Sequence, residues 1–341
     1  MDHARMRQKM MQAAQSLQQR ADSSVVFRPS AAGSCVARLW YDQRDVALNQ
    51  REAEDPARAW PALQGQYNET LMGLLLGLAG AKVLLAPSEH ELALIPGGEE
   101  PDDVFGAPPH VDGAIWWPDE INNDTGGWAY LEFKDMRAMA QIALVLKGLY
   151  EERGYWYQAV SYLMQGKYAL RNNAKVKGPD QLNWLQLAQA YPDGLASTLF
   201  VSCAKDPSTT KMLLRSQTEP AKYEDNPDKM KPEQFVMQAL KRSRRERLEL
   251  LGGAEFYFEH VLKTDESVIA AWADIVAIPQ ALKSTTPPST SHDPLLPAGD
   301  LDEECAWYCA HAEECKEYTT RQMLGQSTPS GEPLDPFRGL A

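Results

Sequence analysis

The stretch from His110 to Asp135, HVDGAIWWPDEINNDTGGWAYLEFKD, constrains the fold more than any other part of the chain. Its ends are apolar and predict β-strands over residues 110–117 and 128–134, and the polar, Gly-rich residues between them predict a hairpin-type connection. Charged side chains interrupt both strands. Burying a carboxylate or an ammonium group on a sheet is costly unless the charges meet each other or a metal ion. The stretch therefore predicts a charged site built into a sheet.

Alternation along the second strand decides which charges share a face. Glu132 and Lys134 point to one side of the sheet and Phe133 points to the other. Asp112, on the neighbouring strand, can reach the side of Glu132. Two carboxylates at this spacing suit a hard divalent cation such as Mg²⁺ or Mn²⁺, and an adjacent lysine can orient a water or stabilise charge on a phosphate. A cross-strand ion pair on the surface is the alternative interpretation.

The order of the other predicted elements indicates an α/β protein with a mixed sheet flanked by helices. Helices are predicted over residues 1–24, 34–44, 56–80, 138–150, 155–170 and 233–262. Further strands are predicted over residues 81–87 and 196–206. Loops or linkers are predicted over residues 97–109, 206–232 and 281–300.

Composition excludes several classes of protein. The net charge is −13, with 34 Lys and Arg against 47 Asp and Glu, which argues against non-specific adhesion to nucleic acid. The longest apolar run, residues 71–85, contains Lys82 and is too short for a membrane span, and the N-terminus lacks the apolar core of a signal peptide. We therefore expect an intracellular, cytoplasmic protein that does not enter a membrane.

Residues 229–247 form a basic block, although the net charge of the chain is negative. It favours either a phosphate-contacting helix or a solvated helix face. Its cations are Lys229, Lys231, Lys241, Arg242, Arg244, Arg245 and Arg247.

Together the motifs of the charged strands resemble the PD-(D/E)XK nucleases, specifically their RecB-like exonuclease branch. The resemblance covers residues 34–206 and 303–318 and implies a restriction-endonuclease-like core. The upstream helical motif of the family matches Gly65 and Glu69, although Glu69 also suits the start of a helix. His110 shares the face of Asp112, and a structural histidine is the alternative. The implied catalytic residues are Asp112, Glu132 and Lys134, and the implied metal contacts are Asp112, Glu132, the Phe133 carbonyl, Glu69 and His110.

The resemblance also implies residues that hold DNA. The stretch YWYQAVSYLM supplies Gln158 and Tyr162, which match the Gln-x-x-x-Tyr helix motif of the branch. Lys205 ends the following strand, where relatives carry a DNA-contacting residue. A hydrogen-bonded pair on one helix face is the alternative for Gln158 and Tyr162.

Three of the five cysteines, in CAWYCAHAEEC, supply soft ligands and stand one short of a tetrahedral set. They are Cys305, Cys309 and Cys315. The resemblance implies that Cys35 is the fourth ligand of a [4Fe–4S] cluster, because the iron–sulfur members carry one Cys before the nuclease core and three after it. Arg38 and Tyr41 follow Cys35 as in those members. Zinc is the main alternative, since His311 lies within the cluster, and free thiols are another. Cys203 reads as a buried small hydrophobe.

We therefore expect a metal-dependent DNA exonuclease that acts in recombination, repair or phage DNA processing, in the cytoplasm of a cell or of a phage host. The alternative is a catalytically inactive, nuclease-fold DNA-binding or assembly protein stabilised by the cluster. Recombination or replication proteins are possible partners, as is a second copy of the chain. The expected segments are a helical N-terminus (1–55), the nuclease core (56–210), a helical basic extension (211–283), a linker (284–300) and the cysteine cluster with the tail (301–341).

Overall fold

A five-stranded mixed sheet stands at the centre of the computed structural model, which describes residues 31–44, 56–87, 92, 105, 110–117, 127–219, 231–251 and 253–284. The strands lie in chain order: β1 (Lys82–Leu85), β2 (Gly113–Trp116), β3 (Ala129–Met136), β4 (Ser197–Ala204) and β5 (Phe256–Leu262). Only β3 and β4 run parallel, and the other neighbouring pairs are antiparallel. The prediction of an α/β chain with a mixed sheet is confirmed.

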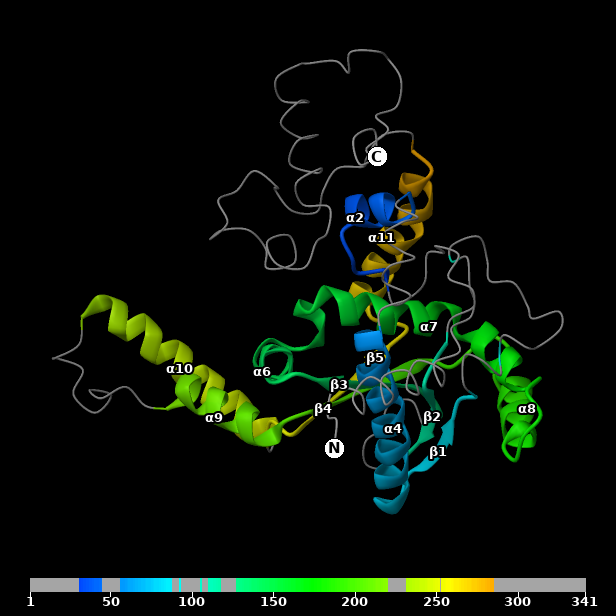
Figure 1. The fold of residues 1–341 in the computed structure, drawn as a ribbon, viewed down its shortest axis with the longest axis horizontal. Coiled ribbons are helices and arrows are strands. Elements are labelled where there is room, and N and C mark those ends of the chain that lie inside the picture. The colour runs from blue at the N-terminus through cyan, green and yellow to red at the C-terminus, as the bar shows by residue number, and fades with distance from the viewer. Residues whose placement is uncertain are drawn as a thin grey trace, which may run out of the picture.

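Helices cover both faces of this sheet (Figure 1). The long helix α4 packs against β1 and β3 on one face, whereas α6 and α7 contact β4 on the other face. The described helices are α2 (Val36–Asp42), α4 (Pro56–Leu78), α6 (Ala138–Lys147), η2 (Leu149–Glu151), α7 (Arg153–Asn173), α8 (Gln181–Ala190), α9 (Pro207–Thr218), α10 (Pro232–Leu251) and α11 (Glu266–Leu282). Within the described residues, no helix is both long and apolar enough to cross a membrane.

Alternation along β3 divides the core into two apolar clusters. Tyr130 and Met136 pack with residues of α6 and α7, whereas Leu131 and Phe133 pack with Met72 of α4. Successive apolar residues of β3 therefore alternate between the two clusters. The charged residues of β3 obey the same alternation, so Glu132 and Lys134 lie on the side of α7.

A glycine lets α7 approach the sheet closely. A Cβ atom on Gly166 would lie 2.2 Å from the ring of Tyr130, far inside contact distance. The Tyr130 hydroxyl in turn accepts a 3.0 Å hydrogen bond from the amide of Leu195, just before β4. This packing holds α7 over the face of β3 that carries Glu132.

Two predictions about the residues after β4 were wrong. The polar stretch 206–232 was expected to be a loop, but it contains α9, which begins where Asp206 Oδ1 accepts a 2.9 Å hydrogen bond from the Thr209 amide. The predicted helix over residues 233–262 ends at Leu251, and β5 follows it. Gly253, at φ +147°, adopts a backbone conformation that L side chains rarely take, and it separates helix from strand.

The sheet therefore uses a strand from the segment that was expected to be a helical extension. β5 pairs antiparallel with β4 from Ser197↔Leu262 to Cys203↔Phe256. The helices α9 and α10, which are side by side in Figure 1, connect the two strands. The predicted strand over residues 110–117 is shorter than expected, since β2 begins at Gly113 and Asp112 precedes it. Helix 1–24, loop 97–109 apart from Phe105, and nearly all of linker 281–300 lie outside the described residues.

Candidate active site

Asp112 closes the end of the β2–β3 ladder. The last paired residues are Gly113 and Leu131, and β3 continues beyond them. The Asp112 carboxylate takes the place of the missing partner, because its Oδ2 accepts a 2.6 Å hydrogen bond from the Phe133 amide. Gly113 permits this position: a Cβ atom there would lie 2.5 Å from the main-chain oxygen of Leu84 on β1. The backbone thus fixes one carboxylate beside the charged residues of β3.

Glu132 is the most deeply buried charged side chain of the site. Its side chain has no exposed surface, and its Oε1 pairs with the ammonium group of Lys134, which is 26% exposed. Apart from this ion pair, neither carboxylate oxygen of Glu132 has a hydrogen-bond partner in the described part of the chain. A buried carboxylate with so few partners is costly in a folded protein.

The electrostatics of this pair favour a further cation. Burial is the main cause that raises the pKa of Glu132 well above its usual range. The neighbouring Asp112 carboxylate raises this pKa further, and Lys134 offsets part of the increase. Burial by itself lowers the pKa of Lys134, but the charges of Glu132 and Asp112 outweigh burial and hold it above its ordinary value. Lys134 is therefore a cation that balances one of two carboxylates. A divalent cation would relieve the remaining repulsion.

Helix α7 brings an aromatic residue to the same face. The Tyr155 ring lies 5.9 Å from the ring of Phe200, which is the neighbour of Glu132 in the β3–β4 register. Burial raises the pKa of the Tyr155 hydroxyl, and the charge of Lys134 partly offsets this effect. Sequence reasoning missed Tyr155 as a site residue. The signal was available, since Tyr155 stands about one helical turn before Gln158 and so shares its helix face.

The residues of the Gln-x-x-x-Tyr motif bind each other. Gln158 Nε2 donates a 2.6 Å hydrogen bond to the Tyr162 hydroxyl, and the two side chains are 7% and 4% exposed. This pairing is the one expected of a hydrogen-bonded pair on a helix face. Contact with DNA stays a prediction for both residues.

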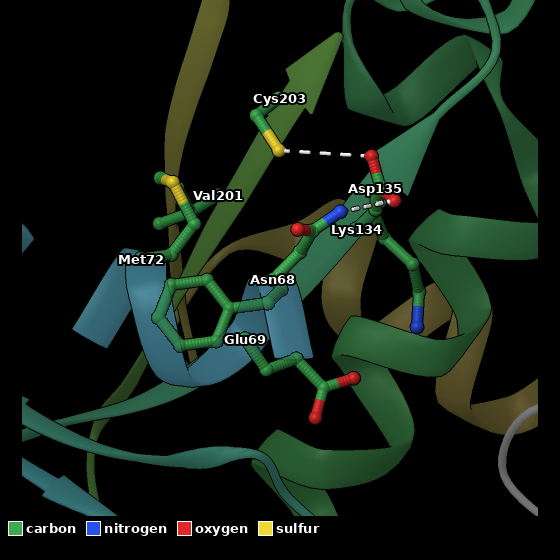
Figure 2. Close-up of a pocket in the computed structure, with 8 residues that line it drawn as sticks. Asn68, Glu69, Met72, Lys134, Asp135, Val201 and Cys203 are labelled. Atoms are coloured by element: carbon green, nitrogen blue, oxygen red, sulfur yellow. Dashed lines mark hydrogen bonds between the residues drawn. The ribbon is translucent and has the colours of Figure 1, made fainter. Parts of the chain in front are cut away.

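A pocket between α4 and the end of β3 contains one further predicted residue, Glu69 (Figure 2). It encloses about 260 Å³ of empty space, part of it open to solvent, and is lined by Glu69 and Lys134 among others. Lys205 lies near it, with its ammonium nitrogen 3.3 Å from the Asp135 carboxylate. Its charge is thus balanced within the protein, and its contact with DNA stays a prediction.

Only part of the predicted metal shell comes together. Asp112 and Glu132 are neighbours, but no group of three or more His, Cys, Asp or Glu side chains able to hold a metal ion occurs among the described residues. His110 Nε2 donates a 2.9 Å hydrogen bond to the Pro87 carbonyl, which is the structural role considered as its alternative. The structure therefore offers two adjacent carboxylates, with Glu69 in a neighbouring pocket.

The cysteines divide between described and undescribed parts of the chain. Cys305, Cys309 and Cys315 lie outside the described residues. Cys35 is 6% exposed and stands at the N-terminus of α2. Helix α2 is tied to the end of α11, because Trp40 Nε1 donates a 2.9 Å hydrogen bond to the Ser284 carbonyl and Arg44 Nη2 donates one of 3.1 Å to the same oxygen. The Cys35 segment thus adjoins the point from which the chain continues towards the three other cysteines.

Cys203 differs from the expected buried hydrophobe. It is half-buried, and its thiol lies 3.9 Å from Asp135 Oδ1. Burial raises the pKa of this thiol to about 11, and the Asp135 charge contributes to the increase. The thiol therefore stays protonated near neutral pH.

Comparison with known proteins adds no relative. The chain matches no family model, no curated protein and no solved structure. The resemblance to the PD-(D/E)XK nucleases therefore rests on the sequence motifs alone.

Proposed function

We propose that the chain is a metal-dependent DNA exonuclease that hydrolyses phosphodiester bonds during recombination, repair or phage DNA processing in the cytoplasm. One observation carries the proposal. The fully buried carboxylate of Glu132 lies beside the Asp112 carboxylate, and the Lys134 ammonium is the one cation paired with it among the described residues. Such a group fits a cation, since burial otherwise penalises its charge.

The residues present have suitable chemistry for a hard cation. Asp112 and Glu132 would hold Mg²⁺ or Mn²⁺ through oxygen atoms, with help from the Phe133 carbonyl. The cation would stabilise negative charge on the scissile phosphoryl group and promote ionisation of a water. Lys134 remains protonated, so its role is to orient the attacking water and to balance charge. Gln158, Tyr162 and Lys205 would hold the substrate strand.

Labelled DNA tests this proposal. Linear, circular and single-stranded DNA labelled at the 5′ or 3′ end is incubated with the protein and Mg²⁺ or Mn²⁺, and the products are resolved on a gel. We expect end-dependent, metal-dependent degradation that disappears in Glu132→Gln and in Lys134→Ala. Equal cleavage by wild type and both variants would contradict the assignment.

A catalytically inactive, nuclease-fold protein that binds DNA or assembles with other proteins is the second candidate. Two observations favour it: Glu132 is already paired with Lys134, and Gln158 is already bonded to Tyr162. In such a protein these pairs would stabilise the core and take no part in catalysis. The same gel distinguishes the candidates, because this one predicts retarded DNA mobility with no metal-dependent product.

We further propose that Cys35, Cys305, Cys309 and Cys315 hold a [4Fe–4S] cluster, with Zn²⁺ as the alternative. The bonds from Trp40 and Arg44 to Ser284 support this proposal, because they hold the Cys35 segment next to the start of the C-terminal segment. A cluster there would fasten the two ends of the chain and so act in folding.

A further inference from the structure

The Asp135 carboxylate joins three elements on the face of the sheet that α4 covers. Its Oδ2 accepts a 2.7 Å hydrogen bond from Asn68 Nδ2 on α4 and lies 3.3 Å from the Lys205 ammonium, just after β4. Its Oδ1 faces the Cys203 thiol at 3.9 Å. The Asp135 side chain is only 7% exposed. A nearly buried carboxylate with a cation and an amide donor holds its partners in a defined geometry.

Both ends of the Asn68–Asp135 hydrogen bond stand next to residues of the proposed site. Asp135 directly follows Lys134, and Asn68 directly precedes Glu69. Successive helical residues are rotated by about 100°, so fixing Asn68 also fixes the direction of Glu69. Figure 2 shows the Glu69 side chain extending from α4 towards the side on which the Lys134 ammonium lies, and both residues line one pocket.

Hydrophobic packing alone does not set the rotation of α4. Met72 and Leu76 face the sheet and are 6% and 4% exposed, whereas Leu74 and Leu78, on the opposite side of the helix, are 59% and 77% exposed. Either side is apolar enough to be buried, because the hydrophobic effect is not directional. The hydrogen bond from Asn68 to Asp135 is directional and distinguishes the two rotations.

We infer that Asn68 is a positioning residue: through Asp135 it sets the rotation of α4 and so holds the Glu69 carboxylate beside Lys134. There Glu69 would act on the cation through its negative charge at longer range, since no group of three metal-binding side chains forms among the described residues. Asn68 itself contacts neither metal nor substrate. The inference rests on the proposed metal site of Asp112 and Glu132.

Mn²⁺ binding to the full-length protein tests this inference without any measurement of cleavage. Electron paramagnetic resonance reports free and bound Mn²⁺ in titrations of wild type, Asn68→Ala, Glu69→Gln and the double variant. Tyr157→Phe is the matched control, because it removes a 2.6 Å hydrogen bond to the Asp274 carboxylate between α7 and α11, away from the site. Thermal unfolding of each variant accompanies the titrations.

We expect Asn68→Ala to weaken Mn²⁺ binding by about 10- to 100-fold, the usual effect of removing a residue that orients a metal site. Glu69→Gln should weaken it at least as much, and the double variant should match Glu69→Gln, since Asn68 acts through Glu69. Tyr157→Phe should bind Mn²⁺ as wild type does, even if it unfolds at a lower temperature.

Two other results would overturn the inference. Unchanged Mn²⁺ binding in Asn68→Ala would remove the positioning role, and multiplicative losses in the double variant would show that Asn68 acts independently of Glu69. The proposed function has a separate test, since Glu132→Gln must also weaken Mn²⁺ binding. If Glu132→Gln binds Mn²⁺ as wild type does, the metal site itself is wrong. If Glu132→Gln weakens Mn²⁺ binding but Asn68→Ala binds Mn²⁺ as wild type does, the metal site is retained and the positioning role is wrong.

Discussion

The main-chain amide of Phe133 donates a 2.6 Å hydrogen bond to the Asp112 carboxylate at the point where β2 and β3 stop pairing. One oxygen of Asp112 therefore completes the sheet, and the carboxylate also raises the pKa of Glu132. Asp112 therefore has a structural role, as the acceptor for the Phe133 amide, and an electrostatic role, as a charge beside Glu132. Different substitutions of Asp112 can separate these two roles.

Asp112→Asn and Asp112→Ala form the first test. Asparagine keeps an oxygen that accepts from the Phe133 amide but removes the charge, whereas alanine removes both. We expect both variants to lose metal-dependent cleavage by about a hundredfold or more. Only Asp112→Ala should also lower the free energy of unfolding, by about 1–3 kcal/mol, because it leaves a main-chain donor without a partner. Gel assays and urea denaturation measure the two effects; equal stability loss in both variants would contradict the structural role.

Gly113→Ala tests the close approach of β1 that positions Asp112. The added Cβ would lie 2.5 Å from the Leu84 oxygen, and main chain cannot move away as a flexible side chain can. We expect a loss of about 1–3 kcal/mol in the free energy of unfolding. Gly77→Ala on α4 is the control, since nothing lies within 4 Å of its new Cβ, and it should stabilise the helix by about 0.5–1 kcal/mol. Comparable stability of the two variants in urea denaturation would argue against the tight contact.

The Cys203 thiol provides a prediction on pH. Because burial and Asp135 raise its pKa to about 11, the reactive thiolate is scarce at pH 8 and increases as the pH rises towards that value. We expect slow alkylation of Cys203 by iodoacetamide at pH 8 and roughly tenfold faster alkylation for each unit of pH up to pH 10. Mass spectrometry of the modified peptide follows the rate. Asp135→Asn should accelerate the reaction at pH 8; rapid alkylation in the wild type would show that the thiol is not shielded as described.

Substitution of single cysteines tests the proposed cluster. Anaerobically purified wild type should be brown, and Cys35→Ala should be paler and unfold at a lower temperature, because loss of a ligand costs folding free energy. Cys305→Ala, Cys309→Ala and Cys315→Ala should behave in the same way, while Cys203→Ala should keep its metal. Metal analysis and visible absorbance are the measurements. Colourless protein with stoichiometric zinc would favour the alternative metal, and metal-free protein of unchanged stability would exclude the site.

Local pattern determined much of the sheet. The alternation around Glu132, Phe133 and Lys134 predicted a strand with two charges on one face, and β3 has that arrangement. Strands near residues 81–87 and 196–206, and helices near 56–80 and 155–170, were also predicted within a few residues. These elements depend on apolar periodicity that is visible in short stretches of sequence.

Tertiary structure decided the rest, because it depends on partners that are distant in the chain. Strand β5 forms where residues 256–262 meet the open edge of β4, although the charged helix before them suggested more helix. The rotation of α4 depends on Asn68 meeting Asp135, which lies 67 residues further along the chain. The burial of Glu132, and with it the cost that a cation would relieve, arises only when α7 packs over β3. Sequence spacing predicts which residues share a face, but only the packed chain decides what that face meets.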